Sequence, residues 1–324
     1  MKTLLDRLER AWFIALPPSR LAIVRIVVGA YALYYVGTRR DMLATLASSA
    51  DFLFRPVGVF RVFDAPISPE LFGWMVDSTL VLGILFVLGW QYRIVGPVFA
   101  LLLLAVFSYR NSWSMIYHSH NPLVLHALVL GVARAADALS IDAWRRRGAV
   151  QPKDSSHWRY GWPIQLICLT TVSIYFLAGV AKVASQLGWA WAGGGSLRDQ
   201  IAVDAIRKDV FGGYAPPLAF TLYDFVWLFT ILGIGSLIIE LGAPLALAAR
   251  RWAYAWVLMT WSLHWGIFFI MDIKFRYQLS GLVFVAFLPM EMLFRRRQEE
   301  VEPGREPPGI APAGLPSSGH ASGG

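Results

Sequence analysis

One lysine and three histidines are the residues of this chain best suited to chemistry. Lys182 ends an apolar run that begins at Trp162 and holds no other charge. A charged side chain at the edge of an apolar helix is costly, so such a residue is a functional candidate by default. His118, His120 and His126 flank the start of another apolar run. We expect Lys182 and His120 to lie at similar depth on one side of a membrane and to form a general-base centre.

The surroundings of both groups favour a role as bases. Asn121 and Pro122 follow His120 and are typical of an N-cap and a first helical turn. The positive end of a helix dipole disfavours protonation of a nearby histidine. Partial burial favours the neutral amine of Lys182, which can accept a proton. These effects predict two neutral bases at the mouth of a pocket that faces lipid.

Two tryptophans and another histidine complete the candidate site. Trp189 and Trp191 come shortly after Lys182, in a segment that continues with three glycines. Tryptophan is enriched where a membrane meets water, and glycine permits a tight turn back to the membrane. His264 lies in the middle of a further apolar run. We expect substrate contacts from His118, Trp189, Trp191 and His264.

Other interpretations of these residues stay open. Lys182 could extend its ammonium to the lipid headgroups, as lysines near the ends of spans commonly do. His118 and His120 could be polar side chains at the membrane surface. With His126 they could bind a metal, but no carboxylate lies nearby in the sequence, and we predict no metal site. A haem between His126 and His264 would require these two histidines to face each other.

Four further charges fall within apolar runs, namely Arg25, Asp77, Arg134 and Glu240. Charges inside a membrane pair with one another or mark a path for protons. We expect Glu240 to pair with Arg134 or Arg25. A proton path is the alternative interpretation.

Composition places the chain in a membrane. Of its 324 residues 56% are hydrophobic and only 15% are charged, whereas about a quarter of a soluble domain is charged. The apolar runs are continuous, which favours helices over a barrel. The single cysteine, Cys168, excludes a disulfide framework within the chain. The net charge of +8 reflects arginines beside the spans, so we expect no nucleic-acid partner.

We predict an all-α fold, a polytopic transmembrane helical bundle of about eight spans. Residues 1–18 have the pattern of an amphipathic helix on the membrane surface, 19–294 form the transmembrane domain, and 298–324 form a disordered cytoplasmic tail. The long connections 38–70 and 184–224 are expected to be folded caps. The spans are expected at 20–37, 71–89, 93–109, 121–139, 162–183, 225–248, 252–271 and 277–293.

Basic residues predict the orientation. More Lys and Arg lie on the side of the termini than on the opposite side, which places both termini in the cytoplasm by the positive-inside rule. The loops 38–70, 110–120, 184–224 and 272–276 then face outward. We predict an integral protein of a bacterial inner membrane, with the lipid bilayer as its surroundings.

Several segments together resemble the HTTM domain, the membrane part of the vitamin K-dependent gamma-carboxylase and its bacterial relatives. The likeness covers about residues 12–294. The most specific part resembles the family's "Y-F-x-A-G-x-x-K-L" and "W-x-x-G-x-x-L", and the others resemble an "R-I-x-x-G" start and an "L-S-x-D" ending. The segments are Leu21–Gly29, His120–His126 with Leu139–Asp142, Ile174–Lys182 with Trp191–Leu197, and Glu240–Pro244 with His264.

The resemblance implies roles for two residues. In the carboxylase, the lysine that matches Lys182 is the proposed base that deprotonates vitamin K hydroquinone. Oxygen then adds, the resulting alkoxide removes the gamma proton of a substrate glutamate, and the carbanion takes up carbon dioxide. A histidine that we match to His120 assists. This chain departs from the pattern at Ala181, where the carboxylase has a second lysine, and we expect no large lumenal domain after the last span.

We therefore predict a carboxylase-like integral membrane enzyme, a lyase or an oxygenase. It would oxygenate a quinol or another lipid-soluble substrate, with Lys182 as base and His120 as its partner. The cofactor is implied by the resemblance alone, as a quinol of the vitamin K type. A non-catalytic scaffold or accessory protein with the same fold is the alternative. A transporter is a third interpretation, weakened because the sequence has no internal repeat.

Overall fold

The computed structural model describes residues 11–113, 116–146 and 156–292, together with Thr3, Asp6 and Glu9. Throughout these ranges the regular structure is helical, and β-type pairing of the backbone is limited to two isolated bridges. The predicted all-α fold is confirmed. The predicted tail 298–324 and seven residues of the predicted surface helix 1–18 lie outside the described residues.

The long and apolar helices form the body of the molecule, and short helices connect them. The body consists of α2 (Pro18–Gly37), α4 (Pro69–Leu88), α5 (Tyr92–Asn111), α6 (Asn121–Val132), α8 (Trp158–Val183), α11 (Val226–Leu241) and α12 (Arg250–Met271). The connections are α3 (Arg40–Leu46), η1 (Asp51–Leu53), η2 (Gly58–Val62), η3 (His118–His120), α7 (Ile141–Arg145), η4 (Gly188–Gly193), α9 (Gly195–Val210), α10 (Pro217–Leu222), η5 (Ala243–Leu247), α13 (Arg276–Leu279) and η6 (Leu282–Phe287).

Five helices of the described chain are long and apolar enough to cross a membrane: α2, α4, α5, α8 and α12. The predicted count of eight is not confirmed, because three predicted runs are interrupted. Helix α6 ends at Val132, α11 gives way to η5 after Gly242, and the last run divides into α13 and η6 at Gly281, where φ is 74°. Irregular backbone at membrane depth is tolerated where protein surrounds it, and residues 283–287 are buried accordingly.

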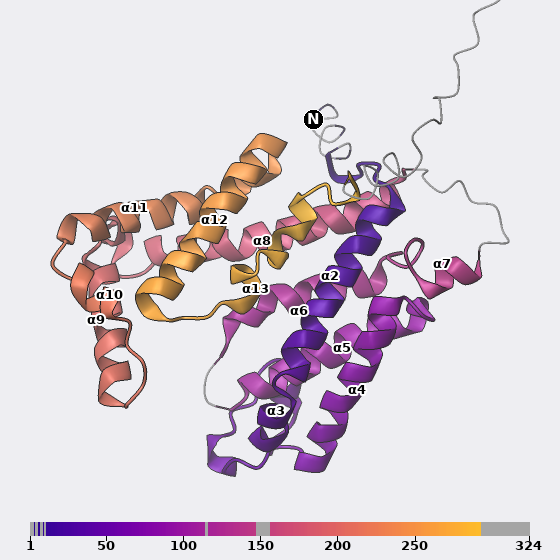
Figure 1. Ribbon diagram of the computed structural model, residues 1–324, viewed down its shortest axis with the longest axis horizontal. Helices are drawn as coiled ribbons and strands as arrows, with labels where there is room; N and C mark the ends of the chain where they lie inside the picture. The colour runs from indigo at the N-terminus through magenta and orange to yellow at the C-terminus, as the bar shows by residue number, and fades with distance from the viewer. Residues whose placement is uncertain are drawn as a thin grey trace, which may run out of the picture.

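Helix α8 is the central element of the bundle. Figure 1 shows α2, α4, α5 and α6 grouped together, and α9 to α12 grouped on the other side, with α8 extending from one group to the other. Helix α8 packs against α2 and α6 in the first group and against α11, η4 and η5 in the second. Its C-terminal end therefore brings Lys182 to α11. The apolar window of α12 is only 17% buried, which leaves most of this helix facing the surroundings, as expected beside lipid.

The two long connections are folded, as predicted. The connection 38–70 contains α3, η1 and η2, and Phe60 within it is buried. The connection 184–224 contains η4, α9 and α10. Here Ile201, Ala205 and Ala219 form a small hydrophobic core with Phe229 of α11. This core holds the second connection against the bundle beside Lys182.

Arg25 of α2 is fully buried and bonds only to backbone oxygens. Its guanidinium donates to the carbonyls of Ala135 at 2.7 Å, Leu139 at 2.5 Å and Val87 at 3.2 Å. These carbonyls belong to the end of α4 and to the segment after α6. No following helical turn is present there to donate backbone N–H groups to them. The arginine thereby connects three parts of the chain around one end of α2.

Gly194 determines how α9 begins beside α11, and its replacement tests this contact. Its φ is 79°, and an added Cβ would lie 2.2 Å from the carbonyl carbon of Phe229. Gly194→Ala should lower the free energy of unfolding by about 2 kcal/mol or more, because a left-handed alanine and a displaced backbone are both costly. Thermal unfolding in detergent measures this loss. Gly193→Ala is the matched control, since nothing lies within 4 Å of its added Cβ. Equal melting temperatures of the two variants would contradict the close contact.

Candidate functional site

Lys182 and Glu240 form an ion pair between α8 and α11. The Nζ atom of Lys182 lies 2.5 Å from Oε1 and 2.6 Å from Oε2 of Glu240. The side chain of Glu240 is 9% exposed and that of Lys182 is 23% exposed. The C-terminal end of α8 also favours a cation, because the helix dipole is negative there. Each charge thus neutralises the other, while one edge of the pair stays accessible.

The ion pair requires α8 and α11 to approach closely, and glycines permit this approach. A Cβ at Gly179 would lie only 2.9 Å from the Cβ of Glu240. Gly179 precedes Lys182 by three residues, so both lie on the same face of α8. On α11, a Cβ at Gly233 would lie 2.8 Å from the backbone oxygen of Trp191. Larger residues at either glycine would separate the elements that hold the pair.

Of the two predicted tryptophans, one contacts the lysine and one does not. The Trp191 ring centroid lies 5.0 Å from Nζ of Lys182, within the range of a cation–π contact. The indole N–H of Trp191 donates to Oγ of Ser236 at 3.3 Å, one turn before Glu240 on α11. Trp189 is 67% exposed. Trp191 therefore shields the ion pair, whereas Trp189 lies at the surface beside it.

His120 belongs to a separate cluster at the start of α6. Its Nδ1 lies 3.2 Å from the carbonyl oxygen of Tyr117, which can only accept, so Nδ1 carries the proton. Its Nε2 then accepts from the Tyr35 hydroxyl and from Arg110, whose Nη1 lies 3.1 Å away. Burial and then the Arg110 guanidinium lower the pKa of His120 to about 3. The lowered pKa has the direction expected for a neutral histidine, but its causes are burial and Arg110, and the free electron pair of Nε2 already has partners.

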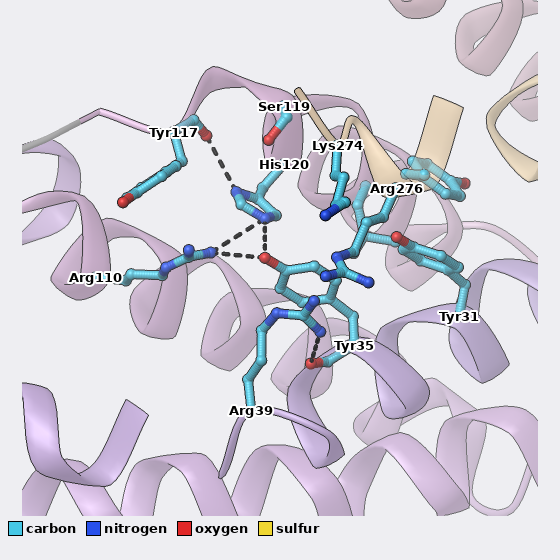
Figure 2. Close-up of a pocket in the computed structure, with 11 residues that line it drawn as sticks. Tyr31, Tyr35, Arg39, Arg110, Tyr117, Ser119, His120, Lys274 and Arg276 are labelled. Atoms are coloured by element: carbon cyan, nitrogen blue, oxygen red, sulfur yellow. Dashed lines mark hydrogen bonds between the residues drawn. The ribbon is translucent and has the colours of Figure 1, made fainter. Parts of the chain in front are cut away.

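A pocket of about 230 Å³ opens beside His120. Figure 2 shows His120, Arg110 and Tyr35 joined by hydrogen bonds on one side of this pocket, with side chains from the chain after α12 facing them. The wall is polar, with several cations and no carboxylate. The lining residues are Tyr31, Tyr35, Arg39, Arg110, Tyr117, Ser119, His120, Leu123, Lys274, Arg276 and Tyr277.

Phe275 contacts the two remaining histidines that we predicted to bind substrate. Its ring centroid lies 5.1 Å from that of His264 and 5.7 Å from that of His118. His264 is buried, and its Nε2 lies 2.8 Å from the hydroxyl of Tyr175. Tyr175 precedes Lys182 by two turns of α8. His118 is exposed. These histidines thus occupy the region between the two clusters.

The predicted pairing of Glu240 with Arg134 or Arg25 is wrong. Glu240 pairs with Lys182, and the hydrogen bonds of Arg25 go to backbone carbonyls. Arg134 lies 4.0 Å from Asp137, and its side chain is 63% exposed. The physical reason is that α6 ends before Arg134, so this residue does not lie inside a spanning helix.

The structure places Lys182 and His120 in different surroundings. Lys182 contacts α11 and η4, whereas His120 contacts α2 and α5, and Lys182 is not among the residues that line the His120 pocket. Glu240 and Trp191 were identified from the sequence but the Lys182–Glu240 pair was not, and Tyr35 and Arg110 were not predicted as partners of His120. Tyr35 and Arg39 are four residues apart at the end of a span. Because residues at this spacing lie on the same face of a helix, the spacing could have indicated that the two side chains are neighbours.

His126 has hydrogen-bond partners at both ring nitrogens. Nδ1 lies 3.1 Å from the hydroxyl of Tyr277, and Nε2 lies 2.9 Å from the hydroxyl of Thr171. Within the described ranges, no group of three or more His, Cys, Asp or Glu side chains could hold a metal ion. Both ring nitrogens of His126 are therefore engaged by hydroxyl groups of the protein.

His120→Gln should reduce the pH dependence of stability. Because the folded pKa lies below the ordinary 6.5, unfolding takes up a proton below that pH. The stabilisation from neutral His120 is complete above pH 6.5 and is lost as the pH falls toward 3. At pH 5 the loss is about 2 kcal/mol. Unfolding in detergent at pH 7.5 and 5.0 should show a smaller drop for His120→Gln than for the wild type. The exposed His118→Gln should keep the wild-type drop, and equal drops in both variants would refute the assignment.

Comparison with protein families agrees with this architecture. The profile of the HTTM domain matches residues 13–265, which is most of the chain. No curated protein and no solved structure gives a significant match. The matched region contains α2, α4, α5 and α8 in full and most of α12, which are the described helices long and apolar enough to cross a membrane. The chain belongs to the HTTM domain family and is an integral membrane protein.

Proposed function

We propose that this protein is a carboxylase-like membrane enzyme that deprotonates a lipid-soluble quinol at the Lys182–Glu240 ion pair. The observation that carries the proposal is the pair itself, held between two apolar helices with the lysine partly accessible. An intramembrane ion pair is expensive to form, because both charges lose their water. A pair retained in such a place, at an accessible edge, is therefore better explained by chemistry than by stability.

The ion pair has the capacity to accept one proton. An amine and a carboxylate together hold one proton in the resting state and can hold two, whichever group carries the first. When a quinol hydroxyl loses its proton, the O–H bond breaks and a new N–H or O–H bond forms on the pair. The pair then carries one positive charge beside the oxyanion that remains on the quinol. This attraction stabilises the product of the transfer.

The surface beside the pair fits such a substrate. Ala178 precedes Lys182 by one turn on the same face of α8 and is exposed, and Trp189 adds an exposed indole. These side chains can contact a quinol ring and its lipid tail, while the hydroxyl reaches the polar pair. A quinol supplies an ionisable hydroxyl and electrons for later oxidation. The proposal is limited to the proton transfer and names no protein substrate.

The other residues expected at the site have positioning roles in this proposal. Trp191 shields the pair, and His264 contacts α8 through Tyr175. His120 acts from its own cluster and has no direct contact with Lys182 in the hydrogen-bond network described above. Catalysis by Lys182 and Glu240 therefore does not need His120 as a second base.

A non-catalytic scaffold is the second candidate function. The observation that favours it is that Lys182 and Glu240 each supply the other's counter-charge. The ion pair would hold α8 against α11 without any substrate. Under this alternative, removal of both charges together would leave function intact, because apolar replacements of a buried pair are often neutral for stability.

Turnover of menaquinol by the purified protein in lipid nanodiscs distinguishes the two candidates. The double variant Lys182→Met/Glu240→Gln removes both charges together, so it should fold. It should lose at least about 100-fold in the oxidation of menaquinol by dissolved oxygen, the electron acceptor supplied in the assay, because this oxidation follows the proton transfer and a general base usually contributes that much. Each single variant should lose as much, and its folding is checked by its melting temperature.

Lys208→Met is the matched control. Lys208 is also paired with a carboxylate, that of Asp204, and its side chain is likewise 23% exposed, but it lies on α9. This variant should keep wild-type turnover. Absence of quinol turnover in the wild type, or full turnover in the folded double variant, would sink the enzyme proposal.

A further inference from the structure

The pocket beside His120 concentrates positive charge where three parts of the chain meet. Arg39 follows the end of α2, Arg110 lies in the last turn of α5, and Lys274 and Arg276 come after α12. Figure 2 shows these four side chains around the ring of Tyr35. None of the lining residues is an acid.

Most of this charge is not neutralised within the described chain. Lys274 pairs with Asp272 at 3.1 Å. Arg39, Arg110 and Arg276 form no ion pair with any described carboxylate. The nearest acid along the chain from Arg39 is Asp41, and Asp41 contacts Arg40, as does Asp77.

The arginines are held in place by tyrosines. The Arg39 guanidinium stacks 3.9 Å from the ring centroid of Tyr35 and donates to the Tyr35 carbonyl at 3.2 Å. Arg110 donates to the Tyr35 hydroxyl at 2.8 Å and lies 4.2 Å from the ring centroid of Tyr117. Like charges held close together repel, which costs electrostatic free energy, and an anion bound between them removes this cost. One guanidinium group can donate two parallel hydrogen bonds to the oxygens of a phosphate, so arginine side chains suit such an anion.

We propose that this pocket binds a phosphate-type oxyanion, supplied by the headgroup of an anionic lipid or by a free phosphate compound. The cavity of about 230 Å³ has room for a phosphate ester. It opens where α2 and α5 end, which is where a bilayer would present its headgroups. Neutral His120 supplies no charge of its own and keeps Arg110 and Tyr35 in position. This inference goes beyond the proposed function and does not depend on the Lys182–Glu240 pair.

Binding is measured on the purified full-length protein by two probes. The first is inorganic phosphate, added to protein in phosphate-free, zwitterionic detergent with chloride at equal ionic strength as reference. The second is phosphatidylglycerol, titrated as detergent-solubilised lipid against phosphatidylcholine. A rise in melting temperature with concentration gives the affinity of each probe, because a ligand that binds the folded state stabilises it. The first probe tests the free anion, and the second tests the lipid headgroup.

The variants Arg39→Gln and Arg276→Gln should each weaken binding of the effective probe by at least tenfold. Arg198→Gln is the matched control. Arg198 stacks 3.9 Å from the ring centroid of Tyr223 and donates to the Tyr223 carbonyl, as Arg39 does with Tyr35, but it lies on α9 outside the pocket. This variant should bind as the wild type does. Failure of both probes to bind the wild type, or an equal loss in Arg198→Gln, would overturn the proposal. So would unchanged binding by a folded Arg39→Gln/Arg276→Gln double variant.

Discussion

Charges inside apolar helices have no water to solvate them, and this constraint organises the molecule. The chain satisfies it in two ways. Arg25 uses carbonyl oxygens that helix ends leave free, whereas Lys182 uses the carboxylate of Glu240. Each solution fixes which segments are neighbours, because removing one partner leaves an uncompensated charge. A buried ion pair adds little net stability, but it selects one packing over others. The junction of α8 and α11 is selected in this way.

The spanning helices were predictable, and their interruptions were not. Helices α2, α4, α5, α8 and α12 begin and end within a few residues of the runs expected from apolar composition. Composition reports burial in lipid or protein, but not whether the buried backbone is helical. The run 277–293 is as apolar as a span, yet residues 282–287 form a short 3₁₀ helix inside the protein. Individual residues such as Gly281 determine whether the buried backbone continues as a helix. Their effect depends in turn on the elements that pack around them.

The candidate residues were also predictable by type, while their partners were not. Lys182 was identifiable because a lone charge in an apolar run is conspicuous. Its partner lies 58 residues further along the chain, and the choice among Glu240 and the other charges depends on which helices pack together. The same holds for Tyr35 and His120, which are 85 residues apart. Hydrogen bonds nonetheless connect the wall of the His120 pocket to α8, the helix that carries Lys182. Tyr277 lines the cationic pocket, and His126 connects its hydroxyl to Thr171 of α8.

The carbonyl partners of Arg25 have a consequence for how the protein is made. Arg25 lies in the first long apolar helix, but its partners come from residues 87, 135 and 139, which are synthesised much later. During synthesis α2 would enter the membrane with an unsatisfied guanidinium, at a cost of up to about 3 kcal/mol. That cost falls only when α4 and the segment after α6 have emerged. The coordination of Arg25 is therefore complete only after the chain has been synthesised as far as residue 139.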